Sequence, residues 1–552
     1  MKATDLLVQA LENEGVEYIF TVPGEETLDL MESIRTSKIA LLVLRHEQVA
    51  GFMAATYGRL KGKAGVCLTT LGPGATNLMT AVAHAQLGSM PMVVITGQKS
   101  IKKHVEGKFQ IVDVVTMMRP LTKATQTIVN VRNIPSLIRE SFHLATAETP
   151  GVVHLELPED IAQESCQGLE PFPVTTHYPP HASDANLEAA IAMIEKAKYP
   201  LLMIGAGANR KRISRALKQF VTKVPMPFFT TQMGKGVIDE SNTLHLGTAA
   251  ISKGDFVHAA IEHADLIINI GHDIVEKPPF RMRKKGANVI HINAHPAQFD
   301  DTYFPQLEVI GEIAHTIDVL RKRLSLRAHC DLSHYYTIRK ARQAHIKALA
   351  ADDTFPIRLP RLVQEVQNVM PKEGILAFDN GLYKLWFARN YVAHHPNTVL
   401  LDNALATMGA GVSVAMGAKL IYPDHKVVAV CGDGGFLMNS NALESALRLG
   451  LDLVILLLRD NAYGMIRWKQ AEMDLPDYGL TFTNPDFVKY AEAYGAFGQR
   501  IMTIEEIGPA LSGCMKKEGV HLLEVHIDYS KSNDRLGKEL AQYTAGIWKK
   551  VK

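Results

Sequence analysis

The chain has 552 residues, 47% of them hydrophobic and 21% charged, which is the composition of a soluble globular protein too long for a single core. A net charge of +2 at pH 7 gives no electrostatic support for binding to nucleic acid or to a membrane surface. Five cysteines without a CxxC spacing argue against a disulfide scaffold or a zinc site and favour a reducing compartment.

The N-terminal block, residues 1–170, alternates predicted strands with helical patterns. Its first twenty residues predict an amphipathic helix followed by a strand, and the acidic residues in this helix exclude a signal peptide. Further strands are predicted at 41–44, 66–69, 92–96 and 152–155. No apolar run approaches the length that spans a membrane, so we expect a cytoplasmic protein.

A proline-rich linker near residues 170–180 leads into a central block, residues 185–325. This block opens with a helix and continues through strands near 201–205, 266–270 and 289–292. A charged segment, residues 321–345, predicts a helical and solvated connector to a C-terminal block, residues 355–552. The pattern predicts an α/β protein of three doubly wound parallel-sheet domains.

Two aspartates follow neighbouring predicted strands of the C-terminal block. The apolar run 427–430 precedes Gly432-Asp433-Gly434-Gly435, a helical pattern covers 441–449, and the strand 453–458 ends just before Asp460. Consecutive parallel strands place both carboxylates at the edge of the sheet where ligands bind. Carboxylate oxygens beside glycines suit a magnesium ion that carries a diphosphate. The alternative is a pair of ordinary turn aspartates, which the second carboxylate makes a weaker interpretation.

A GDG motif, one helix and then an Asn or Asp resemble the cofactor motif of thiamine-diphosphate enzymes. The resemblance implies that Asp433, Asp460 and the backbone carbonyl of Ala462 hold the metal. The cofactor-binding residues that it implies around this motif are Gly432, Asp433, Gly434, Gly435, Asp460, Tyr463, Gly464 and Met465. The wording DNAYGM at 460–465 is similar to the FAD-independent, catabolic branch of acetolactate synthases.

Glu47 stands at the start of a predicted helix, directly after a strand. The segment RHEQ at 45–48 resembles the family's signature around its activating glutamate, which exchanges a proton with the aminopyrimidine ring of the cofactor. The alternative is an ordinary glutamate stabilised by the helix dipole. The resemblance implies that the other half of the site lies on a second subunit, in a homodimer or homotetramer.

Other segments resemble parts of the family's cofactor and substrate sites. Gly24 lies in a Val-Pro-Gly turn that approaches the cofactor, and Gly72 and Asn77 lie in a glycine-rich turn that opens a helix. Phe109 and Gln110 correspond to a pair that faces the reacting carbon, although a surface loop is an equal alternative. The remaining implied residues are Met408, which would support the bent cofactor, and Trp386, Met465, Trp468 and Gln470, which would line the site or its lid.

Three departures separate the chain from FAD-containing synthases. Those enzymes usually carry Gln-His before the conserved tryptophan, whereas this chain has Leu382-Tyr383-Lys384, so the diphosphate contact is lost or passes to Lys384. Residues 272–279 read HDIVEKPP in place of their Arg-Phe-Asp-Asp-Arg motif. The turn GAGA at 205–208 is an incomplete dinucleotide fingerprint. We therefore expect thiamine diphosphate and Mg²⁺ as cofactors, without FAD.

The resemblance implies an acetolactate synthase, which decarboxylates pyruvate and joins the two-carbon unit to a second pyruvate. The alternative is another thiamine-diphosphate-dependent decarboxylase or carboligase that acts on small 2-keto acids. Lys102-Lys103-His104 stands where pyruvate decarboxylases usually carry His-His, and glyoxylate carboligase lacks the glutamate that Glu47 supplies. A nucleotide-binding or regulatory protein built on the central block would leave Glu47, Asp433 and Asp460 without a role.

Overall fold

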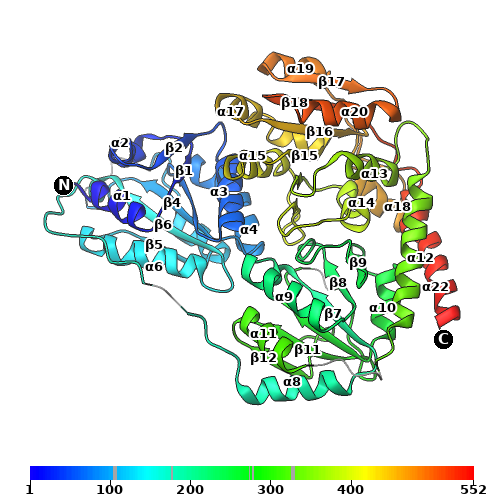
Figure 1. Ribbon diagram of the computed structural model, residues 1–552. Helices are drawn as coiled ribbons and strands as arrows, with labels where there is room; N and C mark the ends of the chain where they lie inside the picture. The colour runs from blue at the N-terminus through cyan, green and yellow to red at the C-terminus, as the bar shows by residue number, and fades with distance from the viewer. Residues whose placement is uncertain (103–107, 176–177, 273, 277–278, 325–329, 552) are drawn as a thin grey trace. The chain divides into compact units, whose positions relative to one another are not determined.

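The computed structural model contains three parallel sheets of six strands each (Figure 1). It covers residues 1–552 and describes all of them except 103–107, 176–177, 273, 277–278, 325–329 and 552. The chain forms two compact units: Met1–His177 with Ala404–Asp424 and Asn439–Leu451, and the remainder. Within the described ranges, no helix has both the length and the apolar character that crossing a membrane requires.

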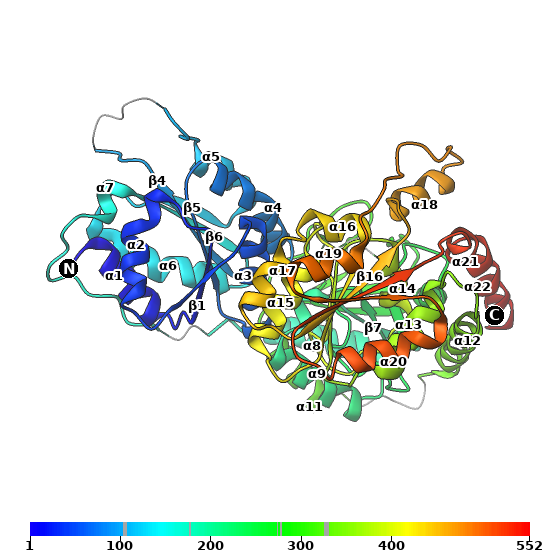
Figure 2. The same cartoon turned by 90° about the horizontal axis from the view of Figure 1, so that it is seen from above.

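The first sheet lies in the first unit and has the strand order β2-β1-β3-β4-β6-β5. Its strands are β1 (Tyr18–Thr21), β2 (Ala40–Val43), β3 (Gly65–Thr69), β4 (Met92–Gln98), β5 (Ala124–Thr127) and β6 (Val152–Pro158). One face is covered by α1 (Ala3–Asn13), α2 (Leu28–Arg35) and α6 (Ile134–Thr146), and the other by α3 (Glu47–Lys61) and α4 (Pro73–Leu87) (Figure 2). The strand order reverses between β1 and β3, which is where open α/β sheets bind ligands.

Helix α3 also packs against a helix from much later in the chain, α15 (Gly411–Ile421). The two backbones approach closely, because a Cβ atom at Gly417 would lie 3.0 Å from the Cβ atom of Thr56. Arg45, just before α3, forms a 3.0 Å ion pair with Glu444 of α17 (Ala442–Arg448). The first unit is therefore completed by two segments from the C-terminal part of the sequence.

The second sheet has the order β12-β11-β10-β7-β8-β9, the strand order of dinucleotide-binding folds. Its strands are β7 (Pro200–Ile204), β8 (Phe228–Thr231), β9 (His245–Ala249), β10 (Leu266–Ile270), β11 (Asn288–Asn293) and β12 (Leu307–Ile310). Its two apolar cores lie under α8 (Asp184–Lys196), α9 (Lys211–Lys223) and α11 (Ile313–Arg323) on one face, and under α10 (Phe256–His263) and α12 (Ser333–Ala350) on the other.

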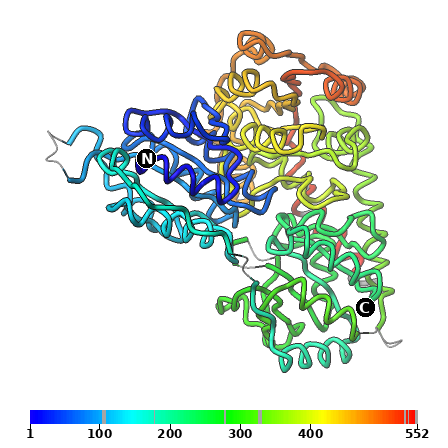
Figure 3. Tube along the Cα trace, turned by 60° about the vertical axis from the view of Figure 1, so that its left-hand side comes forward, coloured from blue at the N-terminus to red at the C-terminus, as the bar shows by residue number. Residues whose placement is uncertain are grey.

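The prediction of a helical segment over 321–345 is confirmed for α12, but the helix is solvated on one face only. This helix buries Tyr335, Ile338, Arg342 and His345 against the second sheet's block. The Arg342 guanidinium donates a 2.8 Å hydrogen bond to the backbone carbonyl of Arg389, and such a partner is what permits a charged group to be buried. The C-terminal helix α22 (Lys538–Val551) packs on the same helix, and Figure 3 shows the red C-terminus beside this green part of the chain.

The third sheet repeats the strand order of the first, as β14-β13-β15-β16-β18-β17. Its strands are β13 (Ile375–Phe378), β14 (Val399–Leu400), β15 (Val427–Gly432), β16 (Leu453–Arg459), β17 (Phe497–Ile501) and β18 (Val520–His526). Its helices in the second unit include α13 (Leu359–Val369), α14 (Leu382–Asn390), α16 (Asp433–Met438), α18 (Gly464–Glu472), α19 (Phe487–Tyr494) and α20 (Ile504–Cys514). Three parallel sheets with flanking helices confirm the predicted fold class.

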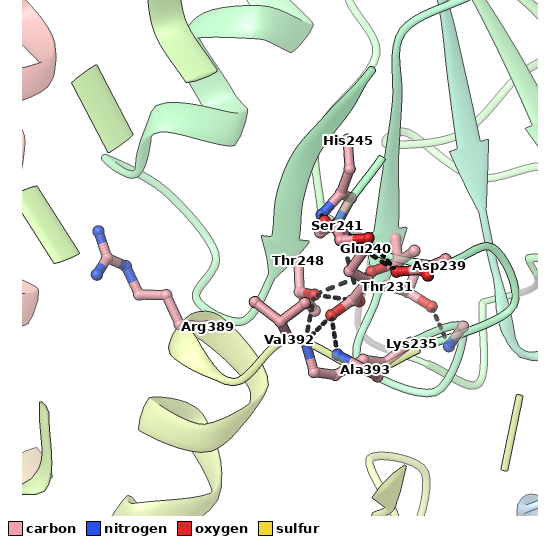
Figure 4. Close-up of polar contacts among 12 residues, drawn as sticks. Thr231, Lys235, Asp239, Glu240, Ser241, His245, Thr248, Arg389, Val392 and Ala393 are labelled. Carbon is pink, nitrogen blue, oxygen red and sulfur yellow. Dashed lines mark hydrogen bonds and ion pairs between the residues drawn. The ribbon is translucent and has the colours of Figure 1, made fainter. Parts of the chain in front are cut away.

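Glu240, which forms a buried ion pair with Lys235, joins the blocks of the second and third sheets inside the second unit through hydrogen bonds with Ala393 (Figure 4). The Glu240 carboxylate accepts hydrogen bonds from Lys235 Nζ at 2.5 Å and from the backbone amide of Ala393 at 2.9 Å. The amide of Glu240 donates in return to the carbonyl of Ala393 at 3.0 Å. Both charged side chains are only 1% exposed, so this junction is a fully enclosed part of the core.

Candidate active site

The predicted carboxylate pair lies at the edge of the third sheet. Asp433 is the first residue of α16, directly after β15, and Asp460 directly follows β16. The Asp433 carboxylate accepts hydrogen bonds from the Gly434 amide (2.9 Å), the Asn461 amide (2.8 Å) and Asn484 Nδ2 (2.7 Å). Asp460 Oδ2 is buried and has no hydrogen-bond partner among the described residues. Parallel neighbouring strands have thus brought the two aspartates together, as the sequence predicted.

The pair carries like charges in a buried place. Burial and the charge of Asp433 raise the pKa of Asp460 to about 7, and the charge of Arg467 only partly opposes this. A divalent cation would remove the repulsion and occupy the unpartnered oxygen, and Mg²⁺ prefers such oxygen ligands together with phosphate oxygens. No group of three or more His, Cys, Asp or Glu side chains in the described part of the chain could hold a metal alone. The donor set fits a metal that shares its coordination with a bound diphosphate.

The glycines of this edge are required by close protein contacts. A Cβ atom at Gly435 would lie 2.7 Å from Asp379 Oδ2, and one at Gly464 would lie 2.8 Å from Asp460 Oδ2. Cβ atoms at Gly432 and Gly434 would lie 3.1 and 3.0 Å from the rings of Tyr383 and Tyr463. Their lack of side chains lets the loops close around the carboxylates. The amide of Ala462 hydrogen-bonds to Asp460, so the third predicted metal ligand lies next to the pair.

Glu47 lies at the edge of the first sheet, at the first position of α3. Its carboxylate is nearly buried, at 8% exposure, and accepts a 3.0 Å hydrogen bond from Asn77 Nδ2 in α4. A Cβ atom at Gly74 would approach Glu47 Oε1 to 3.5 Å, so the glycine-rich turn lies against the carboxylate. The structure therefore brings together Glu47 and Asn77, which the sequence had identified separately.

The other predicted residues of the first block lie on adjoining loops. Gly72 has a φ of +52°, and a Cβ atom there would lie 2.7 Å from the backbone oxygen of Gln110. A Cβ atom at Gly24 would lie 2.3 Å from Thr70 Cβ, so the turns after β1 and β3 are in contact. Gln110 is exposed, and Phe109 is exposed over 74% of its surface. The surface-loop alternative for this pair is compatible with that exposure in a single chain.

Comparison with known proteins assigns the family. Three models of thiamine pyrophosphate (thiamine diphosphate) enzymes match: the N-terminal TPP binding domain at residues 1–117, the central domain at 187–320 and the C-terminal TPP binding domain at 379–525. The acetolactate synthase of Bacillus subtilis (strain 168) is 30% identical over 98% of this chain and 96% of its own length. The chain belongs to the acetolactate synthase family of thiamine-diphosphate enzymes.

Two further relatives show the same end-to-end similarity. The catabolic acetolactate synthase of Raoultella terrigena is 30% identical over 95% of this chain and 95% of its own length. The acetolactate synthase isozyme 2 large subunit of Escherichia coli (strain K12) is 30% identical over 96% of each chain. Thiamine diphosphate is thus the cofactor of this family member, with binding domains at both ends of the chain.

Several residues near the carboxylate pair were missed by the sequence argument. Tyr383 is buried, and its hydroxyl accepts a 3.0 Å hydrogen bond from the Gly432 amide. Asn484 bridges Asp433 and Asn461, and the partly buried Tyr529 lies against Gly464. Asp379 follows β13 at the point where the strand order reverses, so its position was a usable signal. Asn484 and Tyr529 lie outside any motif.

The sequence left open whether the diphosphate contact is lost or passes to Lys384, and in the structure the Lys384 ammonium contacts protein atoms. Lys384 is buried in α14, and its ammonium donates 2.6 Å hydrogen bonds to Asn380 Oδ1 and to the backbone carbonyl of Asp402. Burial lowers the pKa of Lys384 to about 8. These contacts hold the start of α14 beside the loop that contains Asp379 and Asn380.

The residues expected to line the site or its lid have different environments. Trp386 is fully buried in α14, where it is a core side chain, and its indole nitrogen has no partner in the described part of the chain. Met465, Trp468 and Gln470 lie on α18, with Trp468 buried and the other two partly exposed. Met408 is partly buried and belongs to the first unit. Lys103, His104, Asp273, Lys277 and Pro278, which served in the subtype arguments, lie outside the described residues.

Proposed function

We propose that the protein is an acetolactate synthase that converts two molecules of pyruvate into 2-acetolactate and carbon dioxide. Its membership of the family and its end-to-end similarity to three acetolactate synthases support this reaction. The observation that carries the proposal is the buried Asp433–Asp460 pair with its unpartnered oxygen, because it is a ready-made site for a metal-bound diphosphate. Thiamine diphosphate, when bound, accepts the electron pair that carbon dioxide leaves behind.

In this proposal Asp433, Asp460 and the carbonyl of Ala462 hold Mg²⁺, which anchors the diphosphate. The hydrogen bonds of the Gly434 and Asn461 amides and of Asn484 fix the Asp433 carboxylate before the metal binds. The residues expected to surround the diphosphate are Gly432, Gly434, Gly435, Tyr463, Gly464 and Met465. A preorganised donor set of this kind binds its ligand without reorganising the loops.

Glu47 is proposed to exchange a proton with the ring nitrogen of the aminopyrimidine. Asn77 holds one carboxylate oxygen by its 3.0 Å hydrogen bond and so orients the group at the amino end of α3. Gly24 and Gly72 would allow the ring to approach, Met408 would support its conformer, and Phe109 and Gln110 would face the 2-keto acid. Of these segments, the loop that contains Gly72 and the segment that contains Gln110 are in contact in the structure.

We further propose that the protein is of the FAD-independent type. The glycine turn after β7 forms hydrogen bonds within the protein. The Gly207 amide donates to the Gly271 carbonyl at 2.7 Å. A Cβ atom at Gly205 would lie 2.5 Å from His272, so the strand-end crevice is closely packed there. The Gly207 amide, which could otherwise bind a dinucleotide pyrophosphate, is therefore already hydrogen-bonded within the protein.

The assembly is proposed to be a cytoplasmic homodimer or homotetramer with active sites at the subunit interface. None of the five cysteines, all within the described residues, forms a disulfide, which suits a reducing compartment. The Escherichia coli relative is called a large subunit, which supports an assembly of several chains. The proposed domain boundaries remain 1–170, 185–325 and 355–552.

The direct test is incubation of the purified protein with pyruvate, Mg²⁺ and thiamine diphosphate, followed by product analysis and a visible spectrum. We expect 2-acetolactate and carbon dioxide from a colourless protein. Acetaldehyde without acetolactate would overturn the synthase proposal, and flavin absorbance would overturn the FAD-independent assignment. In Glu47→Gln we expect turnover to be largely lost while the cofactor stays bound; full activity would remove Glu47 from the mechanism.

A further inference from the structure

Glu26 is a buried carboxylate that the mechanism above does not use. It lies in the short helix η1 (Glu25–Thr27), directly after the turn that contains Gly24, and its side chain is only 3% exposed. One carboxylate oxygen forms a 2.6 Å ion pair with Lys99 Nζ, and the other accepts a hydrogen bond from the hydroxyl of Thr70. Thr70 directly follows β3 and Lys99 directly follows β4. One carboxylate therefore ties together the loops that follow three neighbouring strands.

These loops carry or adjoin the residues that we assigned to the aminopyrimidine ring and to the 2-keto acid. The loop after β1 carries Gly24 and the loop after β3 carries Gly72, which lies against Gln110, next to Phe109. The switch point of the first sheet lies between β1 and β3, so the tie is at the ligand-binding edge. Glu26, Thr70 and Lys99 are called the Glu26 clasp below.

The packing around the clasp leaves its loops little room to move independently. A Cβ atom at Gly24 would lie 2.3 Å from Thr70 Cβ, and one at Gly97 would lie 2.8 Å from Glu26 Cβ. Because the Gly24 backbone lies against the Thr70 side chain and the Gly97 backbone lies against Glu26, a shift of Glu26 would displace its neighbours. The chain of contacts continues to the substrate-facing segment, since a Cβ atom at Gly72 would lie 2.7 Å from the oxygen of Gln110.

Glu26 is charged in this environment. Burial raises the pKa of Glu26, but the hydrogen bonds from Lys99 and Thr70 more than offset that effect and leave the pKa below its usual value. The same ion pair raises the pKa of Lys99, which has Glu159 and Glu25 as further acidic neighbours. The clasp is thus an ion pair across the pH range in which the enzyme would work.

We propose that Glu26 is a positioning residue, which through Lys99 and Thr70 sets the mutual placement of the loops that carry Gly24, Gly72 and the Phe109–Gln110 segment. This role rests on the proposed function, because those loops are expected to face the 2-keto acid and the aminopyrimidine. Glu26 itself does not touch substrate. Its loss should therefore impair the reaction while leaving the anchoring of the diphosphate, which belongs to the third sheet, unchanged.

The chain offers a matched control in the same unit. Glu14, at the end of α1, forms an ion pair with Arg139 of α6, and both Glu14 oxygens lie 2.5 Å from Arg139 Nη1. The side chains of Glu14 and Arg139 are 6% and 20% exposed, against 3% and 24% for Glu26 and Lys99. Glu14 precedes β1, whereas Glu26 follows it, so the control ion pair does not join the strand-end loops.

The experiment compares Glu26→Gln, Lys99→Met, their double variant and Glu14→Gln as full-length protein with thiamine diphosphate and Mg²⁺. A small misplacement of reacting groups costs about 100-fold, so we expect kcat/KM for pyruvate to fall about 10- to 100-fold in Glu26→Gln and Lys99→Met. The double variant should lose no more than the worse single variant, because both remove one interaction. Cofactor affinity should stay within about twofold, and Glu14→Gln should keep kcat/KM within about twofold.

Hydrogen exchange separates this proposal from the proposed function. The amides of residues 22–28 and 66–76 should exchange faster in Glu26→Gln than in wild type, and should be unchanged in Glu14→Gln, whatever the substrate. If the wild-type protein forms no acetolactate, the proposed function is wrong, but the hydrogen-exchange result still tests the proposed role of Glu26. Unchanged exchange and unchanged kcat/KM in a folded Glu26→Gln, or equal losses in Glu14→Gln, would overturn the proposal. Lys99→Met provides the same test should Glu26→Gln fail to fold.

Discussion

Glu240 and Asp460 are both buried carboxylates of the second unit, but their neighbours differ. Glu240 faces Lys235, the Ala393 amide and the Thr248 hydroxyl, so its charge and its oxygens have partners. Asp460 faces the like charge of Asp433, and its Oδ2 has no partner among the described residues. A complete set of partners indicates a structural role, whereas an incomplete set indicates a place for a ligand.

The pKa values follow the same division. Burial raises the pKa of Glu240, but Lys235, together with His245 and the Ala393 amide, more than offsets this effect, and the pKa is below its usual value. At Asp460, burial and Asp433 act in the same direction and raise the pKa to about 7. Burial is common to both sites, so the sign of the neighbouring charge decides the difference.

The largest expected effect on stability comes from breaking the buried Lys235–Glu240 ion pair. Lys235→Met leaves Glu240 buried without its cation, which should cost about 3–5 kcal/mol of stability. Lys235→Met combined with Glu240→Gln should recover most of this loss, because no buried charge remains and Gln can still accept from Ala393. Denaturant unfolding measures both. Additive losses in the double variant would contradict the structural reading of this pair.

A change in the Asp433–Asp460 pair should affect ligand binding more than stability. Asp433→Asn removes a metal ligand, and we expect the affinity for thiamine diphosphate with Mg²⁺ to fall about 100-fold. The cofactor-free variant should lose less stability than Lys235→Met, since the removal of a like-charge repulsion offsets part of the loss of the hydrogen bonds that Asn cannot accept. Calorimetric titration and thermal unfolding of the cofactor-free protein check the two parts. A loss above about 2 kcal/mol without cofactor would make Asp433 a structural residue.

Low pH should reduce the stability of the region around Glu240 through His245. This histidine is buried and lies 3.8 Å from Glu240. Burial lowers the pKa of His245 to about 4, against about 6.5 in an unfolded chain. Below pH 6.5 His245 takes up a proton in the unfolded state but not in the folded state. Its contribution to the free energy of unfolding is therefore fully present above pH 6.5 and decreases as the pH falls towards 4. The slope should reach about 1.4 kcal/mol per pH unit.

The comparison that isolates this contribution is the pH dependence of unfolding in wild type and in His245→Gln between pH 7 and 4.5. The variant should show a shallower decline, by the contribution of one histidine. Equal slopes would show that His245 does not titrate in this range. His154, buried between Thr96 and Thr125 in the first sheet, has a pKa lowered to about 3 and supplies an independent background slope.

The smallest expected effect concerns the edge of the unsatisfied site. Tyr383→Phe removes the hydroxyl that accepts from the Gly432 amide and should cost about 1 kcal/mol in cofactor binding, or about a fivefold loss of affinity. The carboxylates themselves are unaltered, so the metal dependence should keep its form. The affinity of the variant for thiamine diphosphate, measured at saturating Mg²⁺, checks this; a loss as large as that of Asp433→Asn would show that Tyr383 holds the metal site together.

Sequence reasoning found the parts of the site that depend on regular elements. Asp433 and Asp460 follow consecutive parallel strands, and Glu47 begins a helix after a strand, so their places follow from topology. Glycine disfavours helices, and Gly434 and Gly435 therefore gave no sign that α16 begins at Asp433. Asn484 and Tyr529 arrive through irregular segments, and the burial of Arg342 depends on partners supplied by other helices. No local sequence pattern predicts these contacts between segments that are far apart in the chain.

The make-up of the first unit affects how the chain can fold during synthesis. Helix α3 ends at residue 61, whereas α15, which packs against it, begins at residue 411. Ribosomes add roughly 5–20 residues per second, so the intervening stretch of about 350 residues takes roughly 20–70 s to emerge. Throughout that interval the apolar surface of α3 lacks its cover. A fragment that ends after β6 would contain a complete six-stranded sheet and still aggregate through this surface.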